Sequence, residues 1–441
     1  MIYSSLRASF GIFYPPENKM DYKEALDYME SVGFFGSKPG LERIERLCSA
    51  LGEPQEKLRY IHIAGTNGKG SCAAMLASIL KAAGYRTGLY TSPYLFRFNE
   101  RMQINGEQIP DEALADIVSR IKPLADAMED DHPTEFELMT AAAFLWFAEE
   151  KCDIVVLETG LGGRVDATNI ISGPEVSVIM NIGLDHTGVL GDTVEKIAFE
   201  KAGIIKEGRP CVCYGQTEGV TRVIKEQCAF KGSELTVSDF SALEQIFDSL
   251  DGQAFAYKGK SYALPLLGEH QMKNAAVVID CVEKMRELGW DISPDALERG
   301  LYAVSWPARF EVVSDEPYFV VDGGHNPQCA QTVRDNLLRY FPDKKRVLLI
   351  GVLADKDYEG LVRILDEAAD MYVCVSPESE RALSAAELAE KLAAFGKEVL
   401  YFDSIEEGVE AAKEAAGEDG MVCAVGSLYM AGPVRAMFGL F

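Results

Sequence analysis

The chain has 441 residues, 48% of them hydrophobic and 25% charged, and a formal net charge of −26. This length predicts two domains, and the negative charge argues against nucleic acid or an anionic membrane as a partner. The first residues lack an apolar core with a cleavage site, and no apolar run reaches membrane-spanning length, so we expect a cytoplasmic protein.

Hydrophobic periodicity predicts an order of helices and strands typical of α/β proteins. Helices are predicted at residues 20–34, 41–51, 72–84, 111–128, 135–151, 193–205, 217–228, 270–288 and 294–302. Strands are predicted at 60–64, 88–91, 153–158, 176–181, 212–214, 318–322, 346–351, 371–376, 398–402 and 421–425, with a hairpin at 255–264 and a loop at 92–110. The pattern of predicted elements changes at Pro307, after which strands alternate with helices. We therefore place a boundary there, between domains 1–307 and 308–441.

One stretch organises the first domain. A short apolar strand, 60–64, runs into a glycine-rich loop and then into an Ala- and Leu-rich helix. The loop consists of Gly65, Thr66, Asn67, Gly68, Lys69, Gly70 and Ser71. Its amides and the helix N-terminus favour polyphosphate binding, with Lys69 on the outer phosphates and the Ser71 hydroxyl on Mg²⁺. The expected fold is therefore α/β, with a large P-loop ATPase domain around a central, mainly parallel sheet and a smaller Rossmann-like C-terminal domain.

This loop departs from the usual phosphate-loop spacing. Gly70 separates Lys69 from Ser71, and Ile63 stands where an earlier glycine is usual. A plain glycine-rich turn before a core helix is the structural alternative. The flanking strand and helix favour a nucleotide site.

A second glycine-rich segment follows the strand that ends at Glu158. A carboxylate at a strand end beside a phosphate loop is a natural Mg²⁺ ligand, since this ion takes oxygen ligands and shares them with phosphates. Arg164, Asp166 and Asn169 lie in the same segment. They are candidates for orienting a substrate, and a charged surface turn is an equal alternative.

The chain contains only 5 histidines, and their positions are informative. His186 and His325 follow apolar strands, where open α/β sheets bind ligands. His270 precedes a helix, and a structural role for it is an equal alternative. Lys201, taken by itself, is a lysine at a helix end that favours the helix dipole.

The 10 cysteines include no CxxC pair and fall mostly within predicted strands and helices. Such cysteines are typical of the reduced, buried thiols of a cytosolic protein and not of a disulfide framework.

Taken in order, the motifs resemble those of folylpolyglutamate synthases and bifunctional dihydrofolate synthases, in the Mur ligase superfamily. They are GTNGKGS, TSPYL, FNER, TEFE, LETGLGGRVDATN, GLDHTGVLGDT, EKAGIIK, GEHQMKNA, WPARFE, DGGHNP, GVLADKD and GSLYMAG. The resemblance runs from about Lys38 to Pro433. Three positions depart from it, since Tyr94 replaces a His, Ala308 a Gly and Gly324 an Ala.

The resemblance implies an ATP-dependent amide ligase that joins L-glutamate to tetrahydrofolate or dihydropteroate through an acyl phosphate. Its ligands would be small molecules, and we expect a monomer. The implied roles are phosphate binding by Lys69, Mg²⁺ binding by Ser71, Glu158, His186 and Lys201, adenine contact by Asn274, ribose contact by Asp322, terminal-phosphate contact by Arg309 and His325, glutamate binding by Ser427, and pterin contact by Phe136 and Arg43.

The family motif around Lys201 also implies a modification. The corresponding lysine of the superfamily is often carbamylated by CO₂. An ammonium would be repelled by Mg²⁺, whereas a carbamate supplies anionic oxygen. We therefore expect a carbamate on Lys201.

Two other functions compete with this hypothesis. One is a peptidoglycan-precursor ligase, but the helices before the phosphate loop leave no room for a separate UDP-binding domain. The other is a nucleotide-regulated binding protein without ligase activity, which would have no need of His186, Lys201, Arg309 and His325 together.

Overall fold

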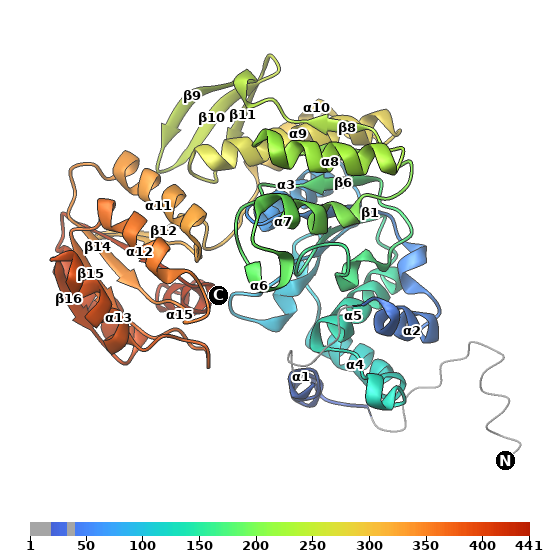
Figure 1. Cartoon of the computed structure of the whole chain (residues 1–441), viewed down its shortest axis with the longest axis horizontal. Coiled ribbons are helices and arrows are strands. Elements are labelled where there is room, and N and C mark those ends of the chain that lie inside the picture. The colour runs from blue at the N-terminus through green and yellow to red at the C-terminus, as the bar shows by residue number, and fades with distance from the viewer. Residues whose placement is uncertain (1–18, 33–39) are drawn as a thin grey trace, which may run out of the picture. The chain divides into compact units, whose positions relative to one another are not determined.

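A computed structural model describes residues 19–32 and 40–441 (Figure 1). The α-helices are α1 Tyr22–Ser31, α2 Glu42–Ala50, α3 Lys69–Ala82, α4 Asp111–Asp126, α5 Glu135–Glu149, α6 Thr187–Leu190, α7 Val194–Lys201, α8 Glu218–Phe230, α9 Glu269–Glu287, α10 Pro294–Tyr302, α11 Pro327–Tyr340, α12 Tyr358–Leu365, α13 Ala385–Leu392, α14 Ile405–Ala416 and α15 Leu428–Met437. The strands are β1 Tyr60–Ala64, β2 Thr87–Tyr90, β3 Met102–Ile104, β4 Glu107–Gln108, β5 Ile154–Glu158, β6 Val176–Ile179, β7 Cys211–Cys213, β8 Leu235–Val237, β9 Leu243–Ser249, β10 Gly252–Tyr257, β11 Lys260–Leu264, β12 Glu311–Asp315, β13 Tyr318–Val321, β14 Arg346–Ile350, β15 Met371–Cys374, β16 Glu398–Tyr401 and β17 Met421–Val425.

The chain divides into two compact units. The first contains the described residues up to Tyr94 together with Phe98–Ser238 and Val277–Leu297, and the second contains Leu95–Arg97, Asp239–Ala276 and Glu298–Phe441. The segment Asp239–Ala276 thus groups with the C-terminal part of the chain. The predicted domain boundary near Pro307 stays a prediction.

The first unit is built on an eight-stranded sheet in the order β4-β3-β2-β5-β1-β6-β7-β8. In this order the neighbouring pairs from β2 to β8 are parallel, whereas the β2–β3 and β3–β4 pairs at one edge are antiparallel. Strands β1 and β5 are buried along their whole length, as central parallel strands covered on both faces must be. The expected mainly parallel sheet is confirmed.

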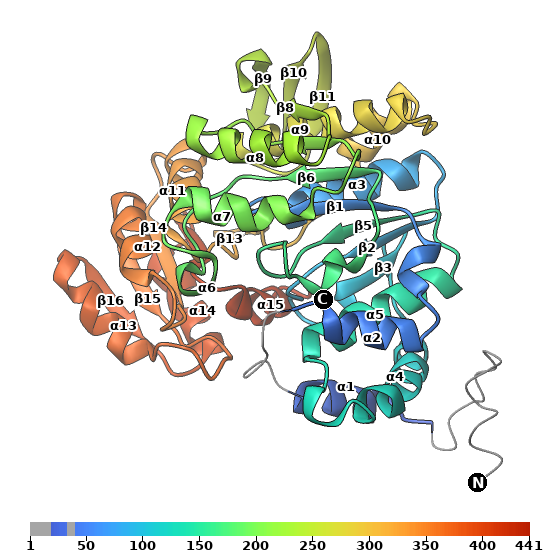
Figure 2. The same ribbon diagram turned by 45° about the vertical axis from the view of Figure 1, so that its right-hand side comes forward.

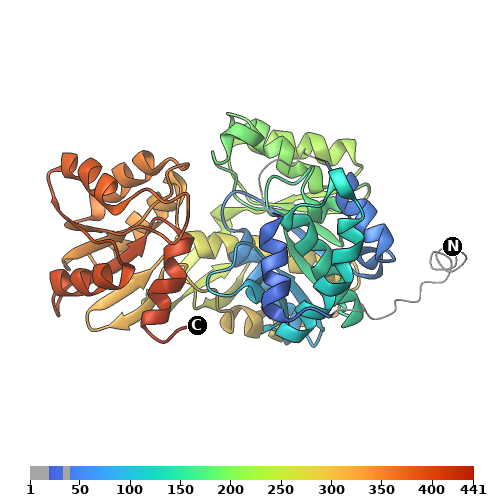
Figure 3. The same ribbon diagram turned by 90° about the horizontal axis from the view of Figure 1, so that it is seen from below.

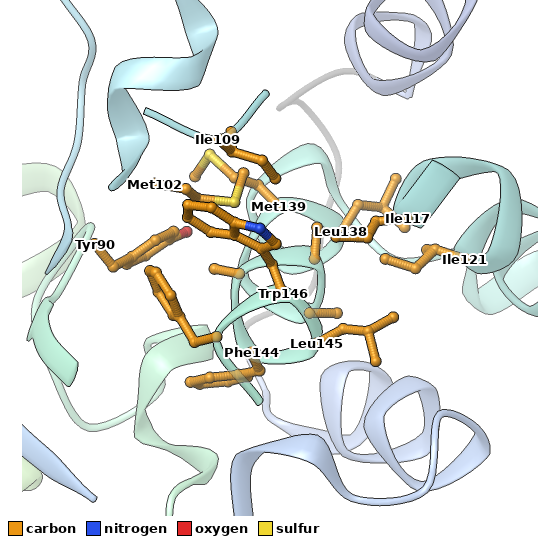
Figure 4. Close-up of a cluster of buried hydrophobic side chains, with 14 of the residues drawn as sticks. Tyr90, Met102, Ile109, Ile117, Ile121, Leu138, Met139, Phe144, Leu145 and Trp146 are labelled. Carbon is orange, nitrogen blue, oxygen red and sulfur yellow. The ribbon is translucent and has the colours of Figure 1, made fainter. Parts of the chain in front are cut away.

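Helices cover both faces of this sheet (Figure 2). The core on one face joins α1, α2, α4 and α5 to β1, β2 and β5. Helix α5 begins at a capping box formed by Thr134 and Glu137, and buried side chains surround most of its length. The side chains of Tyr90, Met102 and Trp146 point into this core (Figure 4). On the other face α7 and α8 pack against β6 and β7.

The second unit carries two sheets. Its six-stranded sheet has the order β12-β13-β17-β14-β15-β16, parallel except for the β12–β13 pair. One core packs α11, α12 and α13 on one face and another packs α14 and α15 on the opposite face, so helices flank the sheet as seen in Figure 3. The other sheet is antiparallel, in the order β11-β10-β9.

The structure corrects some local predictions. Residues 92–110, predicted as a loop, contain β3 and β4, and β8, β9 and β12 were not predicted. Most of these strands are short or exposed at a sheet edge, so their formation depends on pairing with a neighbour more than on an apolar pattern. The prediction about an export signal concerns residues 1–18, which lie outside the described residues, as do residues 33–34 of the first predicted helix and Lys38. Within the described residues no helix is long and apolar enough to cross a membrane.

The prediction of buried thiols is confirmed. All 10 cysteines are unpaired, and each is buried except Cys329, which is partly exposed.

Candidate active site

The glycine-rich loop after β1 is tied to the loop after β6. The amides of Thr66 and Asn67 donate to the carbonyl of Asn181 at 2.8 and 3.2 Å. Gly68 has φ +84°, a left-handed conformation that glycine adopts without strain. Helix α3 begins at the next residue, so its first N–H groups, which have no intrahelical acceptor, lie at the loop.

A cation and a carboxylate meet beside this loop. Lys69 Nζ lies 3.8 Å from Glu158 Oε1 at the end of β5, and both side chains are largely buried. Ser71 lies one turn into the same end of α3 and is 2% exposed. The structure thus brings Lys69 and Glu158 together, and Glu158 does not face solvent.

Lys201 also reaches the loop. It is the last residue of α7, as its sequence context predicts, but it is only 5% exposed and its Nζ donates to the carbonyl of Gly65 at 2.8 Å. Burial, with a contribution from the charge of Lys69, lowers the pKa of Lys201 to about 7. This lysine therefore belongs to the phosphate-loop site and is not a solvent-facing cation.

His186 precedes α6 in a left-handed conformation, φ +49°, and its side chain is about half exposed. Its neighbour Asp185 is more deeply buried, and the carboxylate charge of Asp185 acts to raise the pKa of Lys201. Asp185 was not among the predicted site residues, although it stands beside His186 in the same motif. Asp185 is a further acidic group for this site.

The candidate residues of the second glycine-rich segment, which follows β5, stabilise the conformation of that segment by hydrogen bonds. Asp166 accepts hydrogen bonds from the amide of Leu161 at 2.8 Å and from the amide and hydroxyl of Thr168. Asn169 Nδ2 donates to the carbonyls of Arg164 and Gly203. The guanidinium of Arg164 donates to a backbone carbonyl of α7. These contacts give the three residues a structural role.

The two residues proposed for pterin contact lie in different settings. The ring of Phe136 is partly buried and lies so close to Gly160 that a Cβ there would meet it. Arg43 Nε donates to Glu137 Oε2 at 3.0 Å, and that hydrogen bond raises the pKa of Arg43. Arg43 is therefore engaged with the capping box of α5, whereas Phe136 borders the glycine-rich segment after β5.

In the second unit, Asp322 organises a loop at the carboxyl end of β13. Its two oxygens accept from the amides of Phe310 at 2.8 Å and Gly324 at 2.7 Å. Burial raises the pKa of Asp322, and the nearby Arg309 opposes that rise. Arg309 Nη1 also lies beside Gly323, and His325 Nδ1 is 3.0 Å from the Gly323 carbonyl. The structure thus groups Arg309, Asp322 and His325.

The remaining candidates of this unit lie on two helices. Ser427 caps α15 by accepting from the amide of Tyr429 at 3.2 Å, and the amide of Gly426 donates to Gly324, which joins the Ser427 loop to the Asp322 loop. Asn274, on α9, donates to Gln271 at 3.0 Å. In the same helix His270 Nδ1 is buried without a hydrogen-bond partner, and burial lowers the pKa of His270 to about 4.

The donors near the phosphate loop suit an ion that shares its ligands with phosphates. No three His, Cys, Asp or Glu side chains of the described residues come together as a metal site. Glu158 supplies a carboxylate and Ser71 a hydroxyl there, and Asp185 is a further carboxylate of the site. Mg²⁺ is usually held by one or two carboxylates together with substrate phosphates, so these residues fit it.

Comparison with known proteins identifies the family. The Mur ligase middle domain matches residues 63–282, and the Mur ligase glutamate ligase domain matches residues 308–428. The chain is 36% identical to the dihydrofolate synthase/folylpolyglutamate synthase of Bacillus subtilis over 94% of this chain and 98% of that protein. The chain belongs to the folylpolyglutamate synthase/dihydrofolate synthase family of Mur ligases.

Solved structures of this family agree with the fold. The folylpolyglutamate synthase of Mycobacterium tuberculosis, complexed with ADP and AMPPCP, has a TM-score of 0.87 and 32% identity, and covers 96% of this chain and 100% of that chain. FolC of Escherichia coli, in complex with DHPP and ADP, has a TM-score of 0.85 and 31% identity, covering 95% and 98%. The predicted family, fold class and enzyme class, an ATP-dependent ligase, are confirmed.

Proposed function

We propose that this chain joins the amine of L-glutamate to the carboxylate of tetrahydrofolate and of dihydropteroate, with ATP as the phosphate donor. ATP transfers its terminal phosphate to the carboxylate, and the glutamate amine displaces the phosphate to form the amide. The observation that carries this proposal is the convergence of Lys69, Glu158 and Lys201 on the phosphate loop. Relatives solved with ADP support it.

The residues of the first unit would bind and orient the phosphates. The amides from Gly65 to Ser71 and the Lys69 ammonium would hold the phosphate oxygens, because phosphoryl transfer depends on positioning and charge neutralisation more than on covalent chemistry. Ser71 and Glu158 would hold one Mg²⁺, with His186 and Lys201 at a second. The ion would supply charge neutralisation at the phosphates.

The residues of the second unit would contact the rest of ATP and the amino acid. Asn274 would contact the adenine and Asp322 the ribose, with Arg309 and His325 on the terminal phosphates. Ser427 would contribute to glutamate binding. Phe136 would contact the pterin from the first unit; Arg43 is a weaker candidate, since its guanidinium already pairs with Glu137.

The proposed modification of Lys201 has independent chemical support. Carbamylation joins CO₂ to an uncharged amine with loss of one proton. The lowered pKa leaves a large share of Lys201 uncharged near neutral pH, and a buried site protects the product from water. We also propose that the enzyme is a cytoplasmic monomer without a nucleic acid or membrane partner.

The test is phosphate release from ATP with glutamate plus dihydropteroate or tetrahydrofolate in turn, with the amide product identified by mass spectrometry. We expect release that requires glutamate and one of the two pterins. Lys69→Ala should abolish it while leaving the circular dichroism spectrum unchanged. Lys81→Ala, on the exposed far end of α3, is the matched control. No glutamate-dependent release with either pterin would refute the proposal.

A further inference from the structure

The six-stranded sheet of the second unit has a topological switch point at β17. This strand lies between β13 and β14, but its helix α15 packs on the opposite face from α11 and α12, which follow those two strands (Figure 1). In open α/β sheets, ligands bind outside the carboxyl ends of the strands at such a point. The loops after β13, β14 and β17 meet there, and they include the loops of Asp322 and Ser427.

The loop after β15 is fastened to the loop after β14. Leu353 and Ala382 form an antiparallel bridge, and the amide of Ala354 donates to the carbonyl of Arg381 at 2.9 Å. The amide of Leu383 donates to Val352 at 3.0 Å. These bonds fix the backbone of Arg381 beside the carboxyl end of β14, although Arg381 comes from the next strand along the sheet.

The side chain of Arg381 is directed at the switch point. Its Nη1 donates to Asp355 Oδ2 at 2.9 Å, in the loop after β14. Its Nη2 donates to the Tyr429 hydroxyl at 3.3 Å, and the guanidinium lies 5.8 Å from the Tyr429 ring centroid. Tyr429 stands two residues after Ser427. The loop after β14 and the first turn of α15 therefore orient one guanidinium that is about 42% exposed.

Stability alone does not account for this arrangement. An exposed ion pair contributes little to stability, so Asp355 and Arg381 gain little from each other. A guanidinium has five N–H donors, and the two hydrogen bonds above leave donors that can form a bidentate pair with a carboxylate. In a chain with a net charge of −26, an anionic amino acid needs a local cation of this kind.

We propose that Arg381 is a specificity-determining residue that binds a carboxylate of the incoming glutamate, and that Asp355 and Tyr429 are positioning residues which hold its guanidinium in place. This inference rests on the proposed ligase activity, and it assigns the amino-acid substrate a binding group in the loop after β15. The carboxylate would lie at the switch point, beside the loop of Ser427.

The test is steady-state kinetics of Arg381→Ala, with KM measured separately for glutamate, ATP and tetrahydrofolate. We expect the KM for glutamate to rise about 10- to 100-fold, the range for a lost charge-assisted hydrogen bond, with the other two KM values within about twofold of wild type. Arg381→Lys keeps the positive charge but lacks the planar set of N–H donors of a guanidinium, so it should recover part of the affinity for glutamate. Tyr429→Phe and Asp355→Asn should raise only the KM for glutamate, by smaller factors.

Arg334→Ala is the matched control. Arg334 is also an ion-paired arginine of this unit, bound to Asp335 and Glu367, but it lies within α11 and not on a strand-end loop. An unchanged KM for glutamate in an active Arg381→Ala enzyme would overturn the inference. So would a rise confined to the KM for tetrahydrofolate, because Arg381 would then bind the glutamyl tail of the folate. If the wild type forms no amide from glutamate, the proposed function itself fails.

Discussion

A buried chain of hydrogen bonds connects His62, in the middle of β1, to the glycine-rich segment after β5. His62 Nε2 lies 2.8 Å from Thr168 Oγ1, and the Thr168 hydroxyl donates to Asp166 Oδ1 at 2.5 Å. Because the ionised Asp166 can only accept, His62 must donate its Nε2–H to Thr168. Its Nδ1 is buried without a hydrogen-bond partner, so a second proton on this ring would be unsatisfied.

This arrangement predicts acid sensitivity. Burial lowers the pKa of His62 from 6.5 to about 3, so below pH 6.5 the unfolded chain binds a proton that the folded protein does not. The contribution of neutral His62 to the free energy of unfolding should therefore be fully present above pH 6.5, and it should be lost as the pH falls towards 3. At pH 5 the expected loss is about 2 kcal/mol, from about 1.4 kcal/mol per pH unit.

The measurement is the free energy of urea unfolding at pH 7 and pH 5. His62→Gln should be less stable at pH 7 but lose about 2 kcal/mol less between the two pH values than wild type. His132→Gln, which removes a partly exposed histidine, is the control. An identical pH dependence in wild type and His62→Gln would contradict the prediction.

The carbamate on Lys201 is a second prediction at this scale. Lys201→Ala should lose most of the ligase activity, because the site loses an anionic oxygen donor, and small carboxylates such as acetate should restore part of it. Lys196→Ala, an exposed lysine of the same helix that pairs with Asp192, should stay active. Full activity of Lys201→Ala, or no labelled carbamate signal in enzyme equilibrated with isotopically labelled bicarbonate, would contradict the carbamate.

At the scale of elements, the glycine-rich segment after β5 packs directly on the end of α7. A Cβ on Gly163 would lie 2.8 Å from the carbonyl oxygen of Lys201 and 3.0 Å from that of Glu200. The absence of a side chain therefore lets the segment approach the helix backbone. This contact sets the position of the helix end that carries Lys201 towards the phosphate loop.

Gly163→Ala should consequently displace the end of α7. We expect a loss of about 1–3 kcal/mol of stability from overpacking, together with a loss of phosphate release. Gly188→Ala is the matched control, since a Cβ there would meet nothing within 4 Å. Thermal unfolding and phosphate release of both variants provide the measurement. If the two variants behave alike, the close approach at Gly163 has no role in placing Lys201.

At the scale of the whole molecule, the candidate residues are divided between the two units. Lys69, Glu158 and Lys201 belong to the first, and Arg309 and His325 to the second. We propose that both sets act on the phosphates of one ATP and that ATP binding draws the two units together. We therefore predict that a non-hydrolysable ATP analogue plus pterin reduces the radius of gyration measured by small-angle scattering.

Arg309→Ala should show a smaller reduction, because it lacks one of the phosphate contacts that would favour closure. Arg334→Ala is a suitable control in the same unit. An unchanged radius of gyration in wild type, combined with full activity of Arg309→Ala, would exclude closure through this arginine.

Much of the fold and part of the site could be predicted from the sequence. The strand, glycine-rich loop and helix from Tyr60 to Ala82, the strand end at Glu158 and the alternating strands after Pro307 all follow from local patterns. The family follows from motifs that are themselves local. Short periodicities and glycine positions determine such features because strands, helices and tight turns depend mainly on neighbouring residues.

Only the tertiary structure decided what several side chains do. Lys201 donates to Gly65, 136 positions away, and His62 meets Thr168 across 106 positions. Arg164, a candidate for substrate binding, proved to donate to a carbonyl of α7, Asn169 proved to bond its own loop, and Arg43 proved to pair with Glu137. No spacing in the sequence encodes such contacts, because they arise only when folding packs helices, strands and loops that are distant in the sequence within hydrogen-bond distance of one another.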